Sequence, residues 1–191
     1  MSPSSTIDDP GEPRAAIVVP LKRFDAAKGR LRLGGIDEVT ALARRLAESV
    51  IRNCAPRHVI VLTENEEVAE FAIELGAEML VTDAGGLNDA VQRADQALTG
   101  RYDRLIVVHG DLRHPEGLGL FEPGPGVTIV TDHHGTGTNV LAVPTGAGFR
   151  FAYGPDSLRH HRLEAARLGL ASIVVTDSPW RFDVDEPEDL N

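Results

Sequence analysis

The stretch AAIVVPL, residues 15–21, decides how the rest of the chain is interpreted, because it is apolar throughout and rich in β-branched side chains. A short run of this kind, without alternation of apolar and polar residues, is typical of a strand buried on both faces of a parallel sheet. A cationic segment, residues 22–32, follows it immediately. Residues 15–21 therefore predict an internal strand with a basic loop at its carboxyl end.

Helical and strand-like patterns alternate beyond this strand as far as Asp111. Helical spacing of apolar residues occurs at 36–54, 65–76 and 87–100, and short apolar runs occur at 58–63, 78–82 and 104–111. Strands that alternate with helices at this spacing predict a parallel sheet covered by helices and joined by right-handed crossovers. Ligands of such sheets bind beyond the carboxyl ends of the strands. We therefore expect the basic loop and Asp111 to lie at one edge of the sheet.

The alternation ends after Asp111. Strand-like runs at 127–132 and 139–144 have no helix between them, FRFAYG at 149–154 alternates like a half-exposed strand, and a helix at 155–169 precedes a strand at 171–176. The expected fold class is α/β, with one domain over 14–191, a mostly parallel sheet flanked by helices, and a mixed C-terminal part. Residues 1–13, rich in Ser, Pro, Asp and Gly, predict a disordered leader.

The composition is that of an ordinary globular protein. Of the 191 residues, 42% are hydrophobic and 25% are charged, which fits one domain with one core. The chain has no apolar run long enough to span a bilayer and no signal-like N-terminus, so we expect a cytoplasmic protein without a membrane partner. The net charge of −10 argues against binding to nucleic acid. The single cysteine, Cys54, is expected to be a packed hydrophobic residue rather than a nucleophile.

The basic loop after the first strand is the candidate anion site. The two lysines of the chain, Lys22 and Lys28, both fall in this loop, together with Arg23, Arg30 and Arg32. A solvated basic turn is the alternative interpretation. The position of the cluster, directly after a buried strand in an acidic protein, favours an anion site.

Three aspartates form a candidate metal site. Asp183 and Asp185 are two residues apart in an extended segment, so that both side chains can point to one face, about 6.6 Å apart. Asp111, at the carboxyl end of a predicted strand, can supply a third carboxylate. Three converging carboxylates require a cation between them, and hard oxygen ligands favour Mg²⁺ or Mn²⁺. The alternative is an acidic turn whose aspartates cap backbone amides.

The loop HHGTGT, residues 133–138, is a candidate contact for an anion. Gly135 and Gly137 would allow backbone amides to approach the anion closely, and Thr136 and Thr138 would add hydroxyl donors. The loop lacks the Gly-Lys-Ser/Thr ending of a P-loop. A tight connection between two strands would explain the same string of residues.

The string YGPDS, residues 153–157, marks the start of a helix and offers a second phosphate seat. Gly154 and Ser157 lie where the free amides and the positive dipole end of a helix favour an anion. Capping of the helix by Asp156 or Ser157 is the alternative. Adjacent histidines on a helix point to different faces, so the pair at 160 and 161 does not predict a zinc site.

Five segments together resemble the CofC/FbiD family, the guanylyltransferases of coenzyme F420 biosynthesis. In chain order they are VVPLKRFDAAKGRL (18–31), GLNDAV (86–91), HGTGTNVL (134–141), FAYGPDSLRHH (151–161) and FDVDEPEDL (182–190). The resemblance covers nearly the whole chain after the leader. Its specificity comes from the combination of GTGTN, YGPxS and DVDxPEDL, since each of these strings alone would be weak.

The resemblance implies a nucleotidyltransferase fold like that of nucleotide-diphospho-sugar transferases, Mg²⁺ (or Mn²⁺) as cofactor, and GTP as a substrate. It implies phosphoenolpyruvate as the acceptor, with 2-phospho-L-lactate or 3-phosphoglycerate as alternatives, and passage of the product to the transferase that adds the deazaflavin. By matching positions, the metal ligands would be Asp111, Asp183 and Asp185. The phospho-acid would contact Thr138, Gly154 and Ser157. The nucleotide would contact Lys22, Arg23, Lys28, Arg30, Leu87 and Asn88, with Lys22 and Lys28 as catalytic cations.

Two other functions are compatible with some of these features. A metal-dependent glycosyltransferase or sugar nucleotidyltransferase can share this fold and an Asp-x-Asp motif, although YGPDS and the lack of a large acceptor domain weigh against it. An inactive nucleotide-binding module is the second alternative. The retention of all three aspartates argues against that interpretation.

Overall fold

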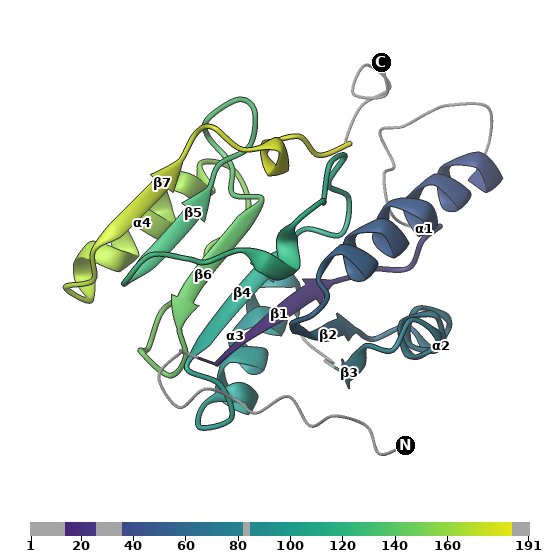
Figure 1. Ribbon diagram of the computed structural model, residues 1–191, viewed down its shortest axis with the longest axis horizontal. Coiled ribbons are helices and arrows are strands. Elements are labelled where there is room, and N and C mark those ends of the chain that lie inside the picture. Colours follow the sequence, from purple (N-terminus) through teal and green to yellow (C-terminus); the bar gives the residue numbers. More distant parts are fainter. Residues whose placement is uncertain (1–13, 26–35, 82–84, 185–191) are drawn as a thin grey trace, which may run out of the picture.

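The computed structural model describes residues 14–25, 36–81 and 85–184 (Figure 1). The leader expected at 1–13 lies outside these ranges, as do four residues of the expected site or basic loop: Lys28, Arg30, Arg32 and Asp185. The strands are β1 (Ala15–Pro20), β2 (His58–Thr63), β3 (Glu78–Val81), β4 (Arg104–Val108), β5 (Val127–Val130), β6 (Val140–Pro144) and β7 (Ser172–Val175). The helices are α1 (Ile36–Asn53), α2 (Glu66–Glu74), α3 (Leu87–Leu98) and α4 (Ser157–Arg167), with single turns η1 (Leu118–Leu120) and η2 (Pro179–Arg181).

The strands form one seven-stranded sheet in the order β3-β2-β1-β4-β6-β5-β7. Four neighbouring pairs are parallel, namely β1–β2, β1–β4, β2–β3 and β5–β7, and β6 is antiparallel to both β4 and β5. The mostly parallel sheet with a mixed C-terminal part is therefore confirmed. Because Val140 pairs with Val108, the reversed strand β6 begins at the edge of the sheet where β4 ends.

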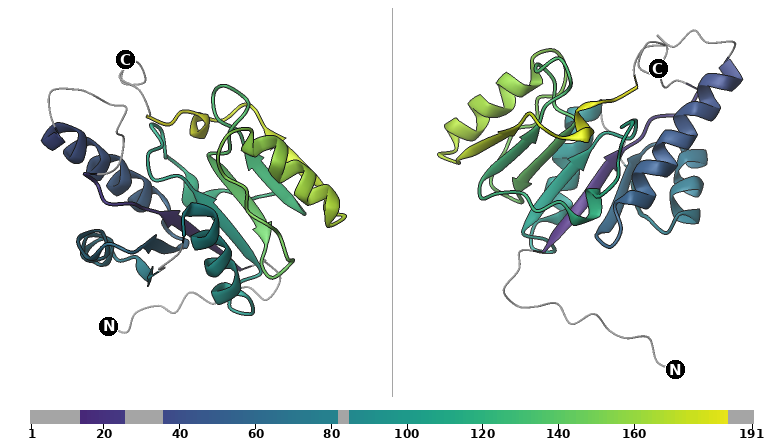
Figure 2. Two further views of the ribbon diagram at one scale, coloured as in Figure 1. Left: turned by 180° about the vertical axis from the view of Figure 1, so that it is seen from behind. Right: turned by 45° about the horizontal axis from the view of Figure 1, so that its top comes forward.

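Helices cover both faces of the sheet. Apolar residues of α1 and α2 pack on one face in a cluster with Ile17 and Val19, and those of α3 and α4 pack on the other with Ala16 and Val18. Figure 2, whose left view is from behind, shows α3 and α4 in front of the sheet. The four central residues of β1 are fully buried, as the apolar run predicted. No described helix has the length and apolar character needed to cross a membrane.

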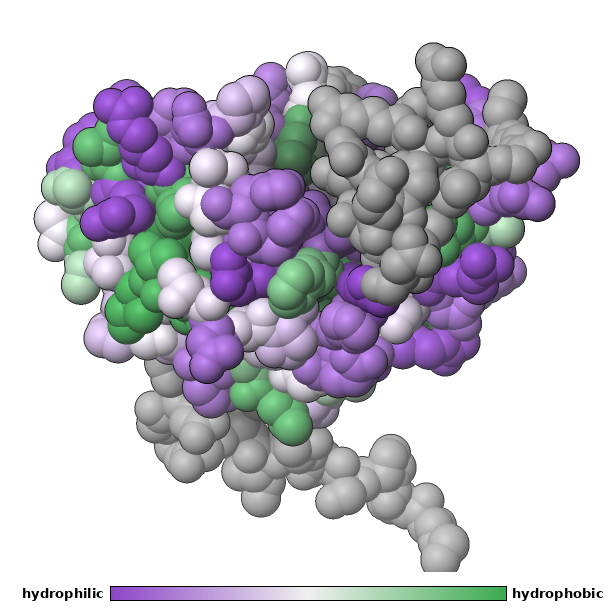
Figure 3. Space-filling model, turned by 90° about the horizontal axis from the view of Figure 1, so that it is seen from above, coloured by the Kyte–Doolittle hydropathy of each residue, from purple (hydrophilic) through white to green (hydrophobic). Residues whose placement is uncertain are grey.

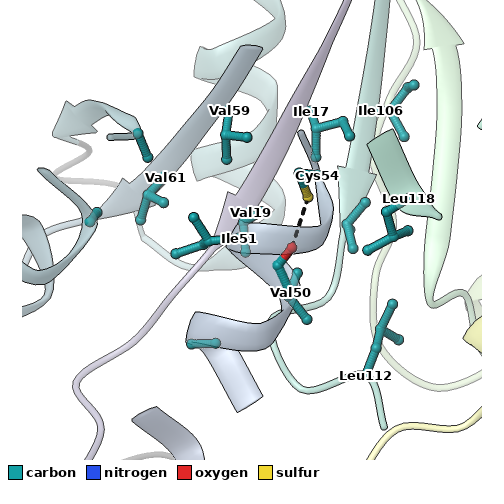
Figure 4. Packing of buried hydrophobic residues seen from close by; sticks show 14 of the residues in the cluster. Ile17, Val19, Val50, Ile51, Cys54, Val59, Val61, Ile106, Leu112 and Leu118 are labelled. Atoms are coloured by element: carbon teal, nitrogen blue, oxygen red, sulfur yellow. Dashed lines mark hydrogen bonds between the residues drawn. The ribbon is translucent and has the colours of Figure 1, made fainter. Parts of the chain in front are cut away.

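Cys54 belongs to the core on the α1 face. Its Sγ atom donates a hydrogen bond to the carbonyl oxygen of Val50 at 3.1 Å (Figure 4). Burial raises the pKa of the thiol to about 12, so the thiolate is not formed at neutral pH. The expectation of a packed hydrophobic residue is met.

The prediction of a strand at 149–154 is wrong. Phe149 and Phe151 are both buried, so the alternation of apolar and polar residues correctly indicates one buried face. The amides of Arg150, Ala152 and Tyr153 donate to Glu164 Oε1, His161 Nε2 and Asn88 Oδ1 at 2.9, 3.1 and 2.6 Å. Side chains of two helices take the place of a neighbouring strand, and the segment remains irregular.

Candidate active site at the carboxyl edge of the sheet

The described segments that reach the carboxyl edge of the sheet come from all parts of the chain. They are residues 21–25 after β1, 109–113 after β4, 131–139 between β5 and β6, 153–157 at the start of α4, and 176–184 after β7. Backbone hydrogen bonds join several of these segments, as between the His109 amide and the Asn139 carbonyl at 3.0 Å, and the Leu158 amide of α4 donates to the Thr136 carbonyl at 3.0 Å. Figure 3, seen from above Figure 1, shows a mainly hydrophilic described surface on this side.

Asp111 and Asp183 are brought side by side by the last described segment. Leu112 and Asp183 form an isolated antiparallel bridge, in which the Arg113 amide donates to the Phe182 carbonyl at 2.8 Å. The Val184 amide donates to the carbonyl oxygen of Asp111 itself at 3.1 Å. Leu112 and Val184 are both buried and anchor the pair of segments. Two of the three predicted metal ligands are therefore neighbours, although they lie far apart in the sequence.

The carboxylate of Asp183 is turned into the protein rather than into bulk water. Its side chain is 15% exposed, and its Oδ1 atom lies 4.0 Å from His133 Nδ1. The Asn139 side-chain amide donates to the same oxygen at 3.4 Å and also to the carbonyl of Trp180 at 3.2 Å. Asn139 thus links the start of β6 to the segment that holds Asp183.

The described residues include no group of three or more His, Cys, Asp or Glu side chains placed to hold a metal ion, and Asp185 lies outside them. Mg²⁺ in enzymes is commonly held by one or two carboxylates, with water and substrate phosphate oxygens completing the octahedron. Asp111 and Asp183 carry hard oxygen donors on neighbouring backbone segments, and such donors fit that chemistry. The three-carboxylate site stays a prediction.

The amides of the glycine loop face an anion of the protein itself. The Thr136 amide donates to Asp132 Oδ1 at 2.8 Å, and the amides of Gly135 and Gly137 also interact with this carboxylate. Burial raises the pKa of Asp132, but the three amides and the positive charge of His134 outweigh burial and lower it below its ordinary value. These amides therefore shape the loop around Asp132, and the hypothesis that they cradle a ligand is not supported.

Thr138 and Ser157 meet in a buried cluster with His161. Their hydroxyl oxygens are 3.2 Å apart, and Thr138 Oγ1 lies 3.1 Å from His161 Nδ1. The three residues are 2%, 3% and 0% exposed, respectively. Gly154 is exposed and has φ of +128°, a conformation that L side chains rarely adopt. Asp156 occupies the N-cap position of α4 without a side-chain capping bond, and the side chain of Ser157 faces Thr138 instead.

The predicted nucleotide contacts are only partly described. Lys22 and Arg23 are exposed at the end of β1, and the guanidinium of Arg23 pairs with Asp25 at 2.6 Å, which raises the arginine pKa. Leu87 packs against the core on the α3 face. The side-chain amide of Asn88 both accepts from the Tyr153 amide at 2.6 Å and donates to its carbonyl at 3.1 Å. Asn88 therefore ties α3 to the segment before α4, and its contact with the nucleoside stays a prediction.

Sequence reasoning missed His161, Asp132 and the linking role of Asn139. One signal for His161 was present, because residues four apart on a helix share a face and His161 is four residues after Ser157. The role of Asp132 depends on how the loop closes on itself, and the sequence carried no comparable signal for it.

The chain is similar in sequence to known proteins over most of its length. The family model described as "Guanylyl transferase CofC like" matches residues 15–191. A phosphoenolpyruvate guanylyltransferase from Mycobacterium sp. (strain KMS) is 31% identical over 187 residues, which cover 92% of this chain and 84% of that protein. The protein of the same name from Sphaerobacter thermophilus is 32% identical over 185 residues, with 91% and 89% covered.

Among solved structures, a putative nucleotide-diphospho-sugar transferase from Desulfovibrio desulfuricans G20 superposes with a TM-score of 0.77 at 16% identity, covering 94% of this chain and 85% of that one. At this identity the likeness concerns the fold alone, and it confirms the expected nucleotidyltransferase fold. With the family model matched from β1 to the last residue, the chain belongs to the CofC-like guanylyl transferases and is a nucleotidyltransferase.

Proposed function

We propose that this protein transfers the guanylyl group of GTP to phosphoenolpyruvate, giving enolpyruvoyl-2-diphospho-5′-guanosine and pyrophosphate in coenzyme F420 biosynthesis. Two relatives that bear the name phosphoenolpyruvate guanylyltransferase match more than nine-tenths of the chain, at 31% and 32% identity. The same chemistry on 2-phospho-L-lactate or 3-phosphoglycerate is the alternative. The product would then pass to the transferase that adds the deazaflavin.

The reaction is an in-line displacement at phosphorus. A phosphate oxygen of the acid forms a bond to the α-phosphorus of GTP while the bond from that phosphorus to the α,β-bridging oxygen breaks. The electron pair of the broken bond leaves with pyrophosphate. The attacking oxygen is already ionised at neutral pH, so no proton has to be removed and no general base is required. Catalysis then consists of positioning and of charge neutralisation.

The residues of this chain divide between the two substrates. Thr138, Gly154 and Ser157 would bind and orient the phospho-acid, and the basic loop with Lys22, Arg23, Lys28 and Arg30 would face the triphosphate. Asp111, Asp183 and Asp185 would hold Mg²⁺ or Mn²⁺. When bound, such an ion supplies positive charge that stabilises the charge developing on the transferring phosphoryl group.

One observation carries the proposal: the hydroxyl pair and the carboxylate of Asp183 are connected through consecutive residues. The hydroxyl of Thr138 is hydrogen-bonded to the hydroxyl of Ser157. The next residue, Asn139, reaches Asp183 with its side-chain amide at 3.4 Å. A phospho-acid held at the hydroxyl pair would therefore lie next to the metal carboxylates. This is the arrangement that attack of one phosphate on another requires.

The test is a matrix of nucleoside triphosphates against phosphoenolpyruvate, 2-phospho-L-lactate and 3-phosphoglycerate. Pyrophosphate release is followed in the presence of Mg²⁺ or Mn²⁺ and with a chelator, and products are identified by mass spectrometry. We expect the GTP–phosphoenolpyruvate pair to give the highest kcat/KM, and the chelator to abolish turnover. Turnover with sugar phosphates alone would support a sugar nucleotidyltransferase instead. GTP binding without pyrophosphate release under any acceptor would support an inactive module.

A further inference from the structure

The hydrogen bonds among Thr138, Ser157 and His161 are more extensive than contact with a substrate requires. We infer that His161 is a positioning residue, which keeps one hydroxyl proton of the Thr138–Ser157 pair available for an anionic oxygen of the phospho-acid. The inference rests on the proposed function, because it concerns the seat of the acid. It assigns to His161 a role in acid binding without direct contact.

The backbone fixes which nitrogen of His161 carries the proton. The amide of Ala152 points at Nε2 with a nitrogen–nitrogen distance of 3.1 Å. A backbone N–H can only donate, so Nε2 must be the acceptor. The proton of the neutral ring is therefore on Nδ1, which donates to Thr138 Oγ1 at 3.1 Å.

This tautomer decides how many protons the hydroxyl pair has left. Thr138 and Ser157 own two hydroxyl protons, and their mutual hydrogen bond at 3.2 Å uses one. When His161 donates to Thr138, the second proton remains available. In the opposite tautomer Nδ1 would accept from Thr138, and both protons would be spent inside the protein. Carboxylate and ionised phosphate oxygens only accept hydrogen bonds, so an anionic substrate needs the remaining donor.

Burial keeps the ring neutral. Desolvation, assisted by the positive charges that His160 and His109 can carry, lowers the pKa of His161 to about 4. The ring packs against Phe149 and Tyr153, with centroid distances of 5.9 and 4.9 Å. An imidazolium ion would also set its Nε2–H against the N–H of Ala152. The neutral ring with its proton on Nδ1 is therefore the form that the surroundings favour.

The first test measures the tautomer directly in the full chain without substrate. Nitrogen-15 chemical shifts of the His161 ring at neutral pH distinguish protonation at Nδ1 from protonation at Nε2. We expect the neutral form protonated at Nδ1. A ring protonated at Nε2, or a charged ring at pH 7, would overturn the inference whatever the enzyme does with GTP.

The second test separates the two ring nitrogens by substitution. In His161→Asn the side-chain amide nitrogen can take the place of Nδ1 and still donate to Thr138. In His161→Gln the amide reaches the place of Nε2 and can accept from Ala152, but the donor to Thr138 is lost, so the hydroxyl proton is no longer directed outward. His160→Asn and His160→Gln, on the exposed neighbouring residue, are the matched controls.

We expect His161→Gln to raise the KM for phosphoenolpyruvate by about 10- to 100-fold, since a hydrogen bond to a charged group is lost, with the KM for GTP unchanged. The KM values of His161→Asn for both substrates should stay within about 3-fold of the wild-type values, because the donor to Thr138 is kept. Equal effects of the two substitutions, or a parallel rise of both KM values, would contradict the inference. Circular dichroism and thermal unfolding verify that the variants fold.

Failure of the proposed function looks different from failure of this inference. If the wild-type protein transfers guanylyl groups to no phospho-acid, the proposed function fails, while the ring tautomer is still measured. If the wild type is active and His161→Gln has an unchanged KM for the acid, the inference alone is wrong.

Discussion

At the scale of single residues, Asp183 is the most sharply placed group of the site, between the bridge to Leu112, the amide of Asn139 and the ring of His133. Asp183→Asn keeps the size of the side chain but removes the charge that a divalent ion needs. We expect kcat to fall by about 10²- to 10³-fold, or about 3–4 kcal/mol, because the ion that would stabilise the charge on the transferring phosphoryl group is then poorly held. Steady-state pyrophosphate release measures the effect.

The control for this substitution is Asp177→Asn, which removes an exposed aspartate from the same connection after β7. It should leave kcat and the melting temperature close to the wild-type values. Near-normal turnover of Asp183→Asn at saturating Mg²⁺ would contradict the assignment of a metal ligand.

Asp132 is expected to be a structural anion of the glycine loop. Asp132→Asn weakens the acceptor that holds the amides of Gly135, Thr136 and Gly137, so we expect a loss of about 1–3 kcal/mol in the free energy of unfolding. Urea denaturation measures the loss, and Asp156→Asn, on an exposed aspartate that makes no side-chain capping bond, is the control. Equal stability of the two variants would show that the loop does not depend on its internal anion.

The pH dependence of stability provides an independent test of Asp132. The amides and His134 lower its pKa against the opposing effect of burial. A carboxyl group whose folded pKa lies below its unfolded value, about 3.9, stabilises the protein above that value and loses this contribution as the pH falls through the folded pKa. The stability difference between the wild type and Asp132→Asn should therefore be full above about pH 5 and shrink below about pH 4. A difference that stays constant over this range would contradict it.

The predictability of the site varied from residue to residue. Asp183, Thr138 and Ser157 lie in recognisable sequence motifs, and the structure places each of them at the carboxyl edge of the sheet. Asn88 was predicted to contact the nucleotide, and this stays a prediction, whereas its hydrogen bonds to Tyr153 could not be predicted because that partner is distant in the sequence. The position of a side chain on a helix face can be read from spacing, whereas its partner on another element cannot.

At the scale of elements, the packing of Val184 holds the segment after β7 against the rest of the site. Val184 is 1% exposed, and its amide donates to the carbonyl of Asp111. Val184→Ala removes two buried carbon atoms and should cost about 2 kcal/mol of stability. We expect kcat to fall more than the stability loss alone explains, because Asp183 is adjacent and loses its support.

Differential scanning calorimetry and pyrophosphate release together test this coupling. Val39→Ala, a half-buried valine in α1 away from the carboxylates, controls for a general loss of stability. If Val184→Ala and Val39→Ala lowered kcat equally at a temperature where both are folded, the segment would have no special link to the site.

The irregular segment at 149–154 shows why element types are harder to predict than burial. Its alternation correctly indicated that Phe149 and Phe151 face the core. The same alternation is produced by any extended chain with one buried face, whether its amides bond to a strand or to side chains. The acceptors here belong to Glu164, His161 and Asn88, and no local sequence pattern predicts these contacts.

At the scale of the whole molecule, the single cysteine reports on global unfolding. Cys54 is 0% exposed in the core between α1 and the sheet, and the pKa of its thiol is raised to about 12. We expect no reaction with a thiol-specific disulfide reagent unless the domain opens. In the regime where closing outpaces labelling, GTP at 100 times its Kd should slow labelling by about 100-fold, the equivalent of about 2.7 kcal/mol.

The comparison variant is Ala41→Cys in a Cys54→Ala background, which places the thiol on the exposed side of α1. Its labelling should be rapid and independent of GTP. Rapid labelling of Cys54 in the native protein would mean that the core on this face opens locally, and the protection by GTP would then vanish.

The architecture was the most predictable property of the chain. Alternating helical and strand-like patterns predict a parallel sheet, because each connection between parallel strands crosses over through a helix. The absence of a helix between 132 and 139 correctly indicated that the chain changes direction there. The order of the strands was not predicted, since any apolar strand can pair with several others. The position of β6 between β4 and β5 depends on the packing of the complete sheet.

The reversal of β6 has a practical outcome for protein engineering. Both ends of the connection 131–139 are anchored on adjoining strands at the same rim, and inside it Thr138 and Asn139 bond to His161 and Asp183. A graft of this connection from a relative would therefore have to bring its partners Ser157, His161 and Asp183 with it, so that the unit of exchange is larger than the loop.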